Sequence, residues 1–217
     1  MSSLNLNLHE NNVYLGVKGV VDKFPERLEK GVAKITKFTF DSNEDILYNL
    51  RAVRNGRMFV MYDGKFVRLT VNGELMMSDT TMERISNLDF INNAKGRVMI
   101  AGLGIGLILE AILNKEEVSE VVVIEKYQDV IDLVEPIYQH PKLKIICADI
   151  FEYEMPSSEK FDVIYFDIWA DISTSNLSEM KQLHNKYRIN KRSKDSFMDS
   201  WLRDFLKQRL KEEDGNY

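Results

Sequence analysis

The feature that most constrains the fold is an alternation of short apolar runs with helix-length stretches in the middle of the chain. Four near-continuous apolar runs lie at residues 97–101, 120–125, 143–148 and 161–167. Such short runs are typical of strands buried on both faces of a parallel sheet. Stretches with helical character lie between them at 107–114 and 128–138. Because parallel neighbours need crossover connections, this order predicts right-handed βαβ units and a doubly wound, mostly parallel α/β sheet.

A glycine-rich turn follows the first expected strand and precedes the first expected helix. It reads A-G-L-G-I-G, from Ala101 to Gly106. Glycine lets the backbone turn tightly and approach a ligand without an intervening Cβ. A tight strand-to-helix turn is the plainer interpretation of this pattern alone, so the case for a ligand depends on the residues at the ends of the other strands.

Acidic residues end or follow the next three expected strands. Glu125 lies about 20 residues after the glycine turn, where an acidic residue can accept hydrogen bonds from ribose hydroxyls. Asp149 follows the third strand, where it can meet an adenine amino group, and Asp167 ends the fourth. A single one of these would be interpreted as a solvated loop carboxylate. Three of them at the ligand-binding edge of an open sheet predict a nucleotide site.

The glycine spacing indicates which nucleotide is bound. Dinucleotide sites carry G-x-G-x-x-G, but here the spacing is G-x-G-x-G, and Leu107 stands where the last glycine would be. Asp149 also suits an adenosine without a pyrophosphate. Both points disfavour an NAD-dependent dehydrogenase and predict S-adenosylmethionine as the cofactor.

The same segments resemble a known family. V-M-I-A-G-L-G-I-G-L, V-V-V-I-E-K, H-P-K-L-K-I-I-C-A-D-I-F-E-Y and K-F-D-V-I-Y-F-D look like the class I S-adenosylmethionine-dependent methyltransferase fold, and within it most like the spermidine synthase branch, including small phage-type members. The likeness covers about residues 71–171, with the lead-in V-N-G-E-L-M-M-S-D-T-T-M-E-R.

The resemblance implies roles for individual residues. The cofactor's methionine portion would be lined by Gly102, Gly104 and Gly106. Glu125 would bind the ribose and Asp149 the adenine. Asp167 matches the aspartate with which spermidine synthases take a proton from the attacking amine.

The chain departs from the spermidine synthase pattern at several positions. Those enzymes read G-G-G-D-G, and their aspartate, which holds the cofactor's amino group, is Ile105 here. Met76 stands where they carry a glutamine, Ile85 replaces their polyamine-binding tyrosine, and D-I-W-A-D replaces D-S-x-D-P. The resemblance therefore implies a retained nucleoside site and an altered acceptor site, which favours methyl transfer over aminopropyl transfer from decarboxylated S-adenosylmethionine.

The acceptor side is expected to form around the loop after the fourth strand. Asp167 is the candidate general base, and Asp171 lies in the same loop. Trp169 can stack on a flat or cationic substrate, although packing beneath the following helix explains it equally well. Asp79 and Glu83 are expected to close the substrate pocket from the other side.

The N-terminal part predicts a smaller, hairpin-rich unit. Its expected strands are 34–40, 58–61, 66–71 and 75–77, with turns at Asp63-Gly64 and Asn72-Gly73 and helices at 44–53 and from residue 80 or 81 to 92. We expect residues 1–94 to form this region, as a lid or dimerisation unit, and residues 95–217 to form the S-adenosylmethionine-binding domain. After Asp167 only helices are expected, at 176–187 and 197–211. The sheet would then lack the last strands of a complete methyltransferase sheet.

Charge and composition limit the kinds of partner that this protein is expected to have. The net charge of −5 disfavours a protein that coats nucleic acid, and the basic stretch 185–194 is interpreted as a solvated loop. One cysteine, no signal-like leader and no membrane-length apolar run predict a cytoplasmic protein without membrane contact. The histidines have no metal-ligand spacing, so no metal is expected. A small-molecule acceptor and a homodimer or higher oligomer are the expected partners. The rival class is a non-catalytic binding or assembly protein on a degenerate methyltransferase fold.

Overall fold

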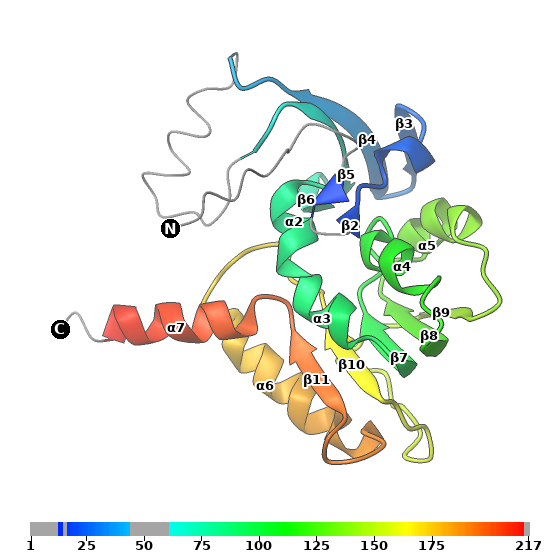
Figure 1. Cartoon of the computed structure of the whole chain (residues 1–217), viewed down its shortest axis with the longest axis vertical. Coiled ribbons are helices and arrows are strands. Elements are labelled where there is room, and N and C mark those ends of the chain that lie inside the picture. Colours follow the sequence, from blue (N-terminus) through cyan, green and yellow to red (C-terminus); the bar gives the residue numbers. More distant parts are fainter. Residues whose placement is uncertain (1–12, 15–16, 44–60, 215–217) are drawn as a thin grey trace, which may run out of the picture.

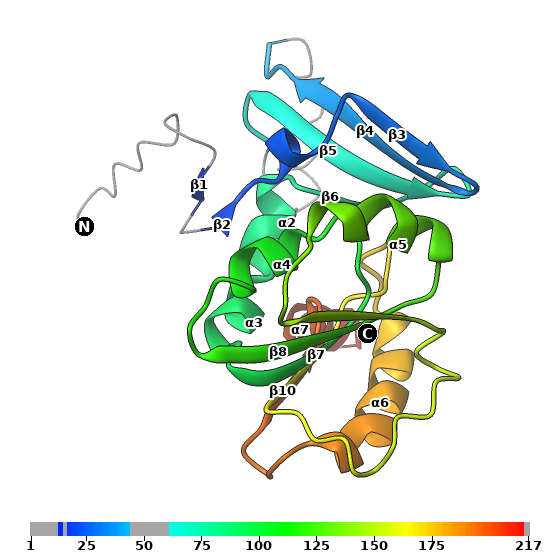
Figure 2. The same cartoon turned by 90° about the vertical axis from the view of Figure 1, so that its right-hand side faces the viewer.

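The computed structural model describes residues 13–14, 17–43 and 61–214. Two sheets dominate these residues. A parallel sheet lies in one part of the molecule and an antiparallel sheet in the other, with helices α4 (Leu107–Ile112) and α5 (Gln128–Val134) between them (Figures 1 and 2). The expected helix at 44–53 and most of the expected strand at 58–61 lie outside the described residues.

The parallel sheet has five strands. They are β7 (Gly96–Ala101), β8 (Val118–Glu125), β9 (Leu143–Cys147), β10 (Val163–Phe166) and β11 (Phe197–Ser200). Their order is β11-β10-β7-β8-β9, and every neighbouring pair is parallel. The chain moves from β7 to one side and later returns to the other, so the order reverses between β7 and β10. This is the doubly wound, Rossmann-like topology, and the predicted fold class is confirmed. Ligands bind such sheets at the carboxyl ends of the strands beside the reversal.

Side chains alternate along these strands between two hydrophobic cores. On β7, Val98 and Ile100 belong to the core that includes α4 and α5, while Met99 and Ala101 face the other core. That second core contains residues of α6 (Asn176–Tyr187) and α7 (Arg203–Asp214). Burial on both faces explains why β7, β8 and β10 read as continuous apolar runs.

The antiparallel sheet has four strands in the order β3-β4-β5-β6. They are β3 (Arg27–Lys30), β4 (Ala33–Phe40), β5 (Gly64–Val71) and β6 (Glu74–Ser78). Asn72 and Gly73 both have positive φ, 53° and 81°, as a two-residue hairpin of this kind requires, so the predicted turn is confirmed. Ahead of this sheet lie β1 (Val13–Tyr14), β2 (Val17–Lys18) and the 3₁₀ turn η1 (Val21–Lys23).

The segment after β6 carries the chain to the parallel sheet as two short helices. They are α2 (Thr81–Ser86) and α3 (Leu88–Asn93). The prediction of one continuous helix up to residue 92 is wrong, because the helix is interrupted at Asn87. Asn87 is fully buried there, and its side chain donates to the carbonyl of Glu83 at 3.0 Å and accepts from the Tyr165 hydroxyl at 2.9 Å. These side-chain bonds hold the chain in a bend that periodicity does not reveal.

A buried carboxylate joins the start of α2 to the N-terminal segment. Asp79 and Arg84 are both fully buried, and the guanidinium approaches the carboxylate at 3.4 Å. The Asp79 carboxylate also accepts the backbone amides of Val20, Val21 and Val67 at 2.8–3.1 Å. One carboxylate thus fixes η1, β5 and α2 together.

The C-terminal stretch differs from the expectation of one helix at 197–211. Its first four residues form β11, which pairs with β10, and α7 begins only at Arg203. Trp201 bonds through its amide to the carbonyl of Phe166 at 2.9 Å, and Leu202 adopts a positive φ of 54° in the turn. The open edge of β10 therefore selects a strand that local pattern does not indicate, and the sheet gains one strand over the prediction.

Two 3₁₀ turns complete the described elements, η2 (Glu135–Ile137) after α5 and η3 (Arg188–Asn190) after α6. Across the described ranges, no helix is both long and apolar enough to pass through a membrane.

Candidate functional site

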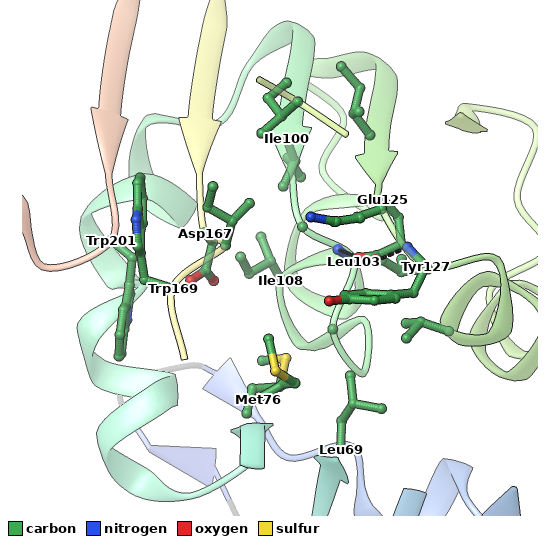
Figure 3. Close-up of a pocket in the computed structure, with 18 of the residues that line it drawn as sticks. Leu69, Met76, Ile100, Leu103, Ile108, Glu125, Tyr127, Asp167, Trp169 and Trp201 are labelled. Carbon is green, nitrogen blue, oxygen red and sulfur yellow. Dashed lines mark hydrogen bonds between the residues drawn. The ribbon is translucent and has the colours of Figure 1, made fainter. Parts of the chain in front are cut away.

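A cavity of about 260 Å³ lies at the carboxyl ends of the parallel strands. Its floor comes from the loops after β7, β8, β9 and β10, and β5 and β6 contribute Leu69, Val71, Met76 and Met77 from the opposite sheet. Figure 3 shows Leu103, Glu125 and Tyr127 on one side of this cavity and Asp167, Trp169 and Trp201 on the other. The site therefore lies where the strand order reverses, as the topology requires.

The glycine turn adopts a backbone that only glycine tolerates well. The φ angles of Gly102, Gly104 and Gly106 are 97°, 53° and 72°. A Cβ on Gly102 would clash with the backbone carbonyl of Asp167, and one on Gly104 would clash with the sulfur of Met77. Gly102 and Gly104 line the cavity. The three glycines thus serve both the turn and the close packing around it.

Glu125 ties the glycine turn to the end of β8. One carboxylate oxygen accepts the Leu103 amide at 2.9 Å and the other accepts the Tyr127 amide at 2.8 Å. The side chain is nearly buried yet lines the cavity. Burial raises the pKa of Glu125, and these backbone donors oppose the rise. Each carboxylate oxygen can accept a further hydrogen bond, so the carboxylate can receive ligand hydroxyls as well.

Asp149 lies at the end of β9, on the same side of the site. Its carboxylate forms an ion pair with Lys126 at 2.9 Å and accepts the Phe151 amide at 2.9 Å. Partial burial pulls the pKa of Asp149 upward, but the Lys126 ammonium and the Phe151 amide outweigh it, so the pKa lies below its ordinary value. An ionised carboxylate is therefore held at the cavity wall, able to accept from an amino group.

Two carboxyl groups meet at the other end of the cavity. Asp167 follows β10, and its amide bonds to the carbonyl of Ala101 at 2.8 Å. Burial raises the pKa of Asp167 to about 7. Glu83, from α2, is almost fully buried, and burial together with the neighbouring Asp167 charge raises its pKa well above the ordinary value. Burial thus favours the protonated form of both carboxyl groups at this end of the site.

Two tryptophans, Trp169 and Trp201, form an apolar wall beside Asp167 (Figure 3). The indole N–H of Trp169 donates to Glu179 at 2.8 Å, and that of Trp201 donates to Ser86 at 2.8 Å. Both indole N–H groups are thereby occupied. Trp169 also belongs to the hydrophobic core that contains residues of α6. It therefore both lines the cavity and packs against the helix that follows it.

Three residues predicted for the site lie outside the cavity. Gly106 is next to the cavity-lining turn but packs against the Tyr138 ring. Asp79 is sealed in the core by its backbone donors and Arg84. Asp171 is exposed and accepts the side chain of Asn176 at 3.0 Å. Neither carboxylate lines the cavity: that of Asp79 holds segments of the fold together, and that of Asp171 accepts a hydrogen bond at the start of α6, so their substrate-binding role stays a prediction.

The sequence interpretation missed several residues of the cavity, namely Met77, Tyr127, Glu179 and Trp201. Tyr127 follows Glu125 by two positions, so its place at the sheet edge was readable. Trp201 was expected on a helix stripe, and only the pairing of β11 with β10 brings it to this edge. Among the described residues, no group of three or more histidine, cysteine, aspartate or glutamate side chains is arranged to hold a metal ion.

No family model matches this chain, and no curated protein matches it. Solved structures similar to part of it include a spermidine synthase from Thermotoga maritima, at 18% identity and a TM-score of 0.42 over 58% of this chain. A spermidine synthase in complex with the transition-state analogue AdoDATO matches at 20% identity and a TM-score of 0.43. The chain spans 45% of the length of each of these two proteins.

A methyltransferase from Clostridium acetobutylicum, described as S-adenosylmethionine-dependent, matches at 18% identity over 48% of this chain and 41% of its own, with a TM-score of 0.33. The strand order of this protein defines its fold class, and the residues that line its cavity define the candidate site.

Proposed function

We propose that this protein is an S-adenosylmethionine-dependent transferase, and specifically a methyltransferase acting on a small nucleophilic acceptor. The observation that carries the proposal is the convergence of Gly102, Gly104, Glu125, Asp149 and Asp167 on one cavity at the strand ends. These residues come from the carboxyl ends of four different strands or the loops that follow them, and the cavity is the place where they meet.

The donor side of the cavity fits an adenosyl ligand. The glycine turn removes Cβ atoms from the cavity floor, as close approach of a ligand requires. Glu125 would accept the ribose hydroxyls and Asp149 the adenine amino group, since both carboxylates reach the cavity with acceptor capacity. The bound cofactor would supply a methyl group already activated on a sulfonium sulfur.

The acceptor side provides the residues that handle the nucleophile. Asp167, with its pKa near 7, would hold the acceptor in line and take the proton that the nucleophile releases. Trp169 and Trp201 would exclude water from this end of the cavity. Met76 and Met77 of the N-terminal sheet would cover the site.

Aminopropyl transfer is the rival reaction within the same class. The resemblance to spermidine synthases favours it, but Ile105, at the position of their cofactor-binding aspartate, is fully buried among apolar side chains and does not line the cavity. Met76 likewise brings a thioether where those enzymes carry an amide. A donor that keeps its carboxylate is therefore the better candidate.

The first experiment is thermal unfolding with a ligand panel of S-adenosylmethionine, S-adenosylhomocysteine, decarboxylated S-adenosylmethionine, methylthioadenosine and NAD. A ligand at 100 times its dissociation constant adds about 2.7 kcal/mol to stability, which gives a readable rise in Tm. We expect the first two ligands to raise Tm most and NAD to leave it unchanged. Preference for the decarboxylated donor would transfer the proposal to aminopropyl transfer, and a flat response to the whole panel would refute both.

A variant separates an enzyme from a non-catalytic binding protein. Asp167→Asn keeps the shape of the acceptor end but cannot take a proton. We expect it to retain the S-adenosylhomocysteine-induced rise in Tm and to lose methyl transfer in an acceptor screen that monitors S-adenosylhomocysteine release. Equal release by the wild type and the variant would contradict a catalytic role for Asp167.

A further inference from the structure

Met77 makes an unusual contact with the glycine turn. Its sulfur accepts a hydrogen bond from the backbone amide of Ile105 at 3.2 Å. The same sulfur lies where a Cβ of Gly104 would stand, so the side chain rests directly on the turn. Met77 is partly buried and lines the cavity. A side chain of the N-terminal sheet thus occupies the Ile105 amide in the glycine turn, which the proposed function places on the cofactor side of the cavity.

An irregularity in β6 brings this side chain to the cavity. Thr70 pairs with Leu75 and Leu69 pairs with Met77, so Met76 is an extra residue in the β5–β6 ladder. In a regular strand, consecutive side chains point to opposite faces, but Met76 and Met77 both line the cavity. Bulges of this kind re-aim side chains and are common beside active sites. The bulge therefore directs two consecutive methionines at the glycine turn and the space beside it.

The hydrogen bond at Ile105 is of a kind that a ligand can replace. A thioether sulfur is a weak acceptor, whereas a carboxylate oxygen forms a shorter and stronger bond with a backbone amide. Methionine is also unbranched and has several rotatable bonds, so it can leave the turn without moving the strand. A ligand group that reaches the Ile105 amide must displace the sulfur, and only a strong acceptor would do so readily.

We infer that Met77 is a specificity-determining residue of the donor site, which competes for the Ile105 amide with the amino-acid end of an adenosyl ligand. This inference rests on the proposed function. Ligands that carry a carboxylate beyond their thioether displace the Met77 sulfur when they bind. Ligands that end at the thioether leave Met77 on the glycine turn. The residue thereby discriminates among adenosyl compounds by what they carry at the end opposite to adenine.

Two ligands that share the adenosyl thioether test the inference. S-adenosylhomocysteine carries the amino-acid end, and methylthioadenosine lacks it. Calorimetry would give both dissociation constants for the wild type, Met77→Ala and Met77→Leu, the last of which keeps the apolar bulk without the sulfur acceptor. Met76→Ala is the matched control, because Met76 lines the same cavity from the neighbouring position.

Loss of the competing bond should tighten binding of S-adenosylhomocysteine to Met77→Ala by about threefold to tenfold, the range for one modest hydrogen bond. Methylthioadenosine does not compete with Met77 for the Ile105 amide, so its dissociation constant should change by less than about twofold. Met77→Leu should shift the ratio of the two constants in the same direction, and it decides the matter if Met77→Ala does not fold. Met76→Ala should leave the ratio unchanged.

An unchanged ratio in both Met77 variants, or weaker binding of S-adenosylhomocysteine, would overturn the inference while leaving the proposed function in place. The same change of ratio in Met76→Ala would overturn the assignment to Met77. If neither ligand binds any of the proteins, the proposed function itself fails and the inference fails with it.

Discussion

Replacement of Asp167 by asparagine should make the stability of this protein less dependent on pH. Burial raises the pKa of Asp167 from its ordinary value of 3.8 to about 7. Between these values the folded protein retains a proton that the unfolded chain releases. The free energy of unfolding therefore falls as pH rises through this window, because ionising the buried carboxyl is easier in the unfolded chain.

The size of the effect can be worked out from the same shift. Each pKa unit corresponds to about 1.36 kcal/mol, so the rise from 3.8 to about 7 corresponds to about 4 kcal/mol as an upper bound. Asparagine has no proton to lose. Asp167→Asn should match the wild type near pH 4 and exceed its stability by up to about 4 kcal/mol at pH 8.

Urea unfolding of both proteins at intervals from pH 4 to pH 8.5 measures this difference directly. Asp171→Asn is the control, because Asp171 belongs to the same loop but is exposed. Its side-chain amide oxygen can still accept the hydrogen bond from Asn176, so this variant reports the effect of the same change at an exposed position. Parallel curves for Asp167→Asn and the wild type would refute the claim that this carboxyl is destabilised by burial. They would also remove the physical basis for its use as a general base near neutral pH.

Four further substitutions test other parts of the structure. Asp79→Ala removes the carboxylate that pairs with Arg84 and accepts three backbone amides, and should lower the free energy of unfolding by about 3–5 kcal/mol in urea titrations. Gly102→Ala should lower it by about 2–5 kcal/mol, because its Cβ meets a backbone carbonyl at a φ of 97°. Gly73→Ala, with nothing within 4 Å, should lose only about 1–2 kcal/mol, and an equal loss at both glycines would contradict the steric argument. Glu125→Gln should weaken S-adenosylhomocysteine binding by about tenfold or more in calorimetry, because one acceptor oxygen becomes a donor that faces a backbone amide or a ribose hydroxyl. Unchanged affinity would remove Glu125 from the proposed site.

The sequence by itself determined the central architecture. The four apolar runs became β7, β8, β9 and β10. In β7, β8 and β10 the continuous apolar character reflects burial on both faces of the sheet, whereas β9 is an edge strand whose Lys144 and Cys147 are exposed. The hairpin turn at Asn72 and Gly73 was equally local, since its backbone angles depend on those residues alone. The sequence also placed Glu125, Asp149 and Asp167 near one another, because parallel strands end at a common edge of the sheet. That rule converts sequence positions into spatial neighbours.

Only the tertiary structure decided the features that depend on distant partners. Phe197–Ser200 is a strand because the edge of β10 offers it hydrogen bonds, and this pairing carries Trp201 to the cavity. Asp79 has the same residue type as Asp167, but amides from two distant segments enclose the first while the second faces the cavity. Met77 reaches the glycine turn through a bulge in another sheet. Periodicity records how much of each side chain is buried, whereas the identity of its partner is set by chain segments far away in sequence.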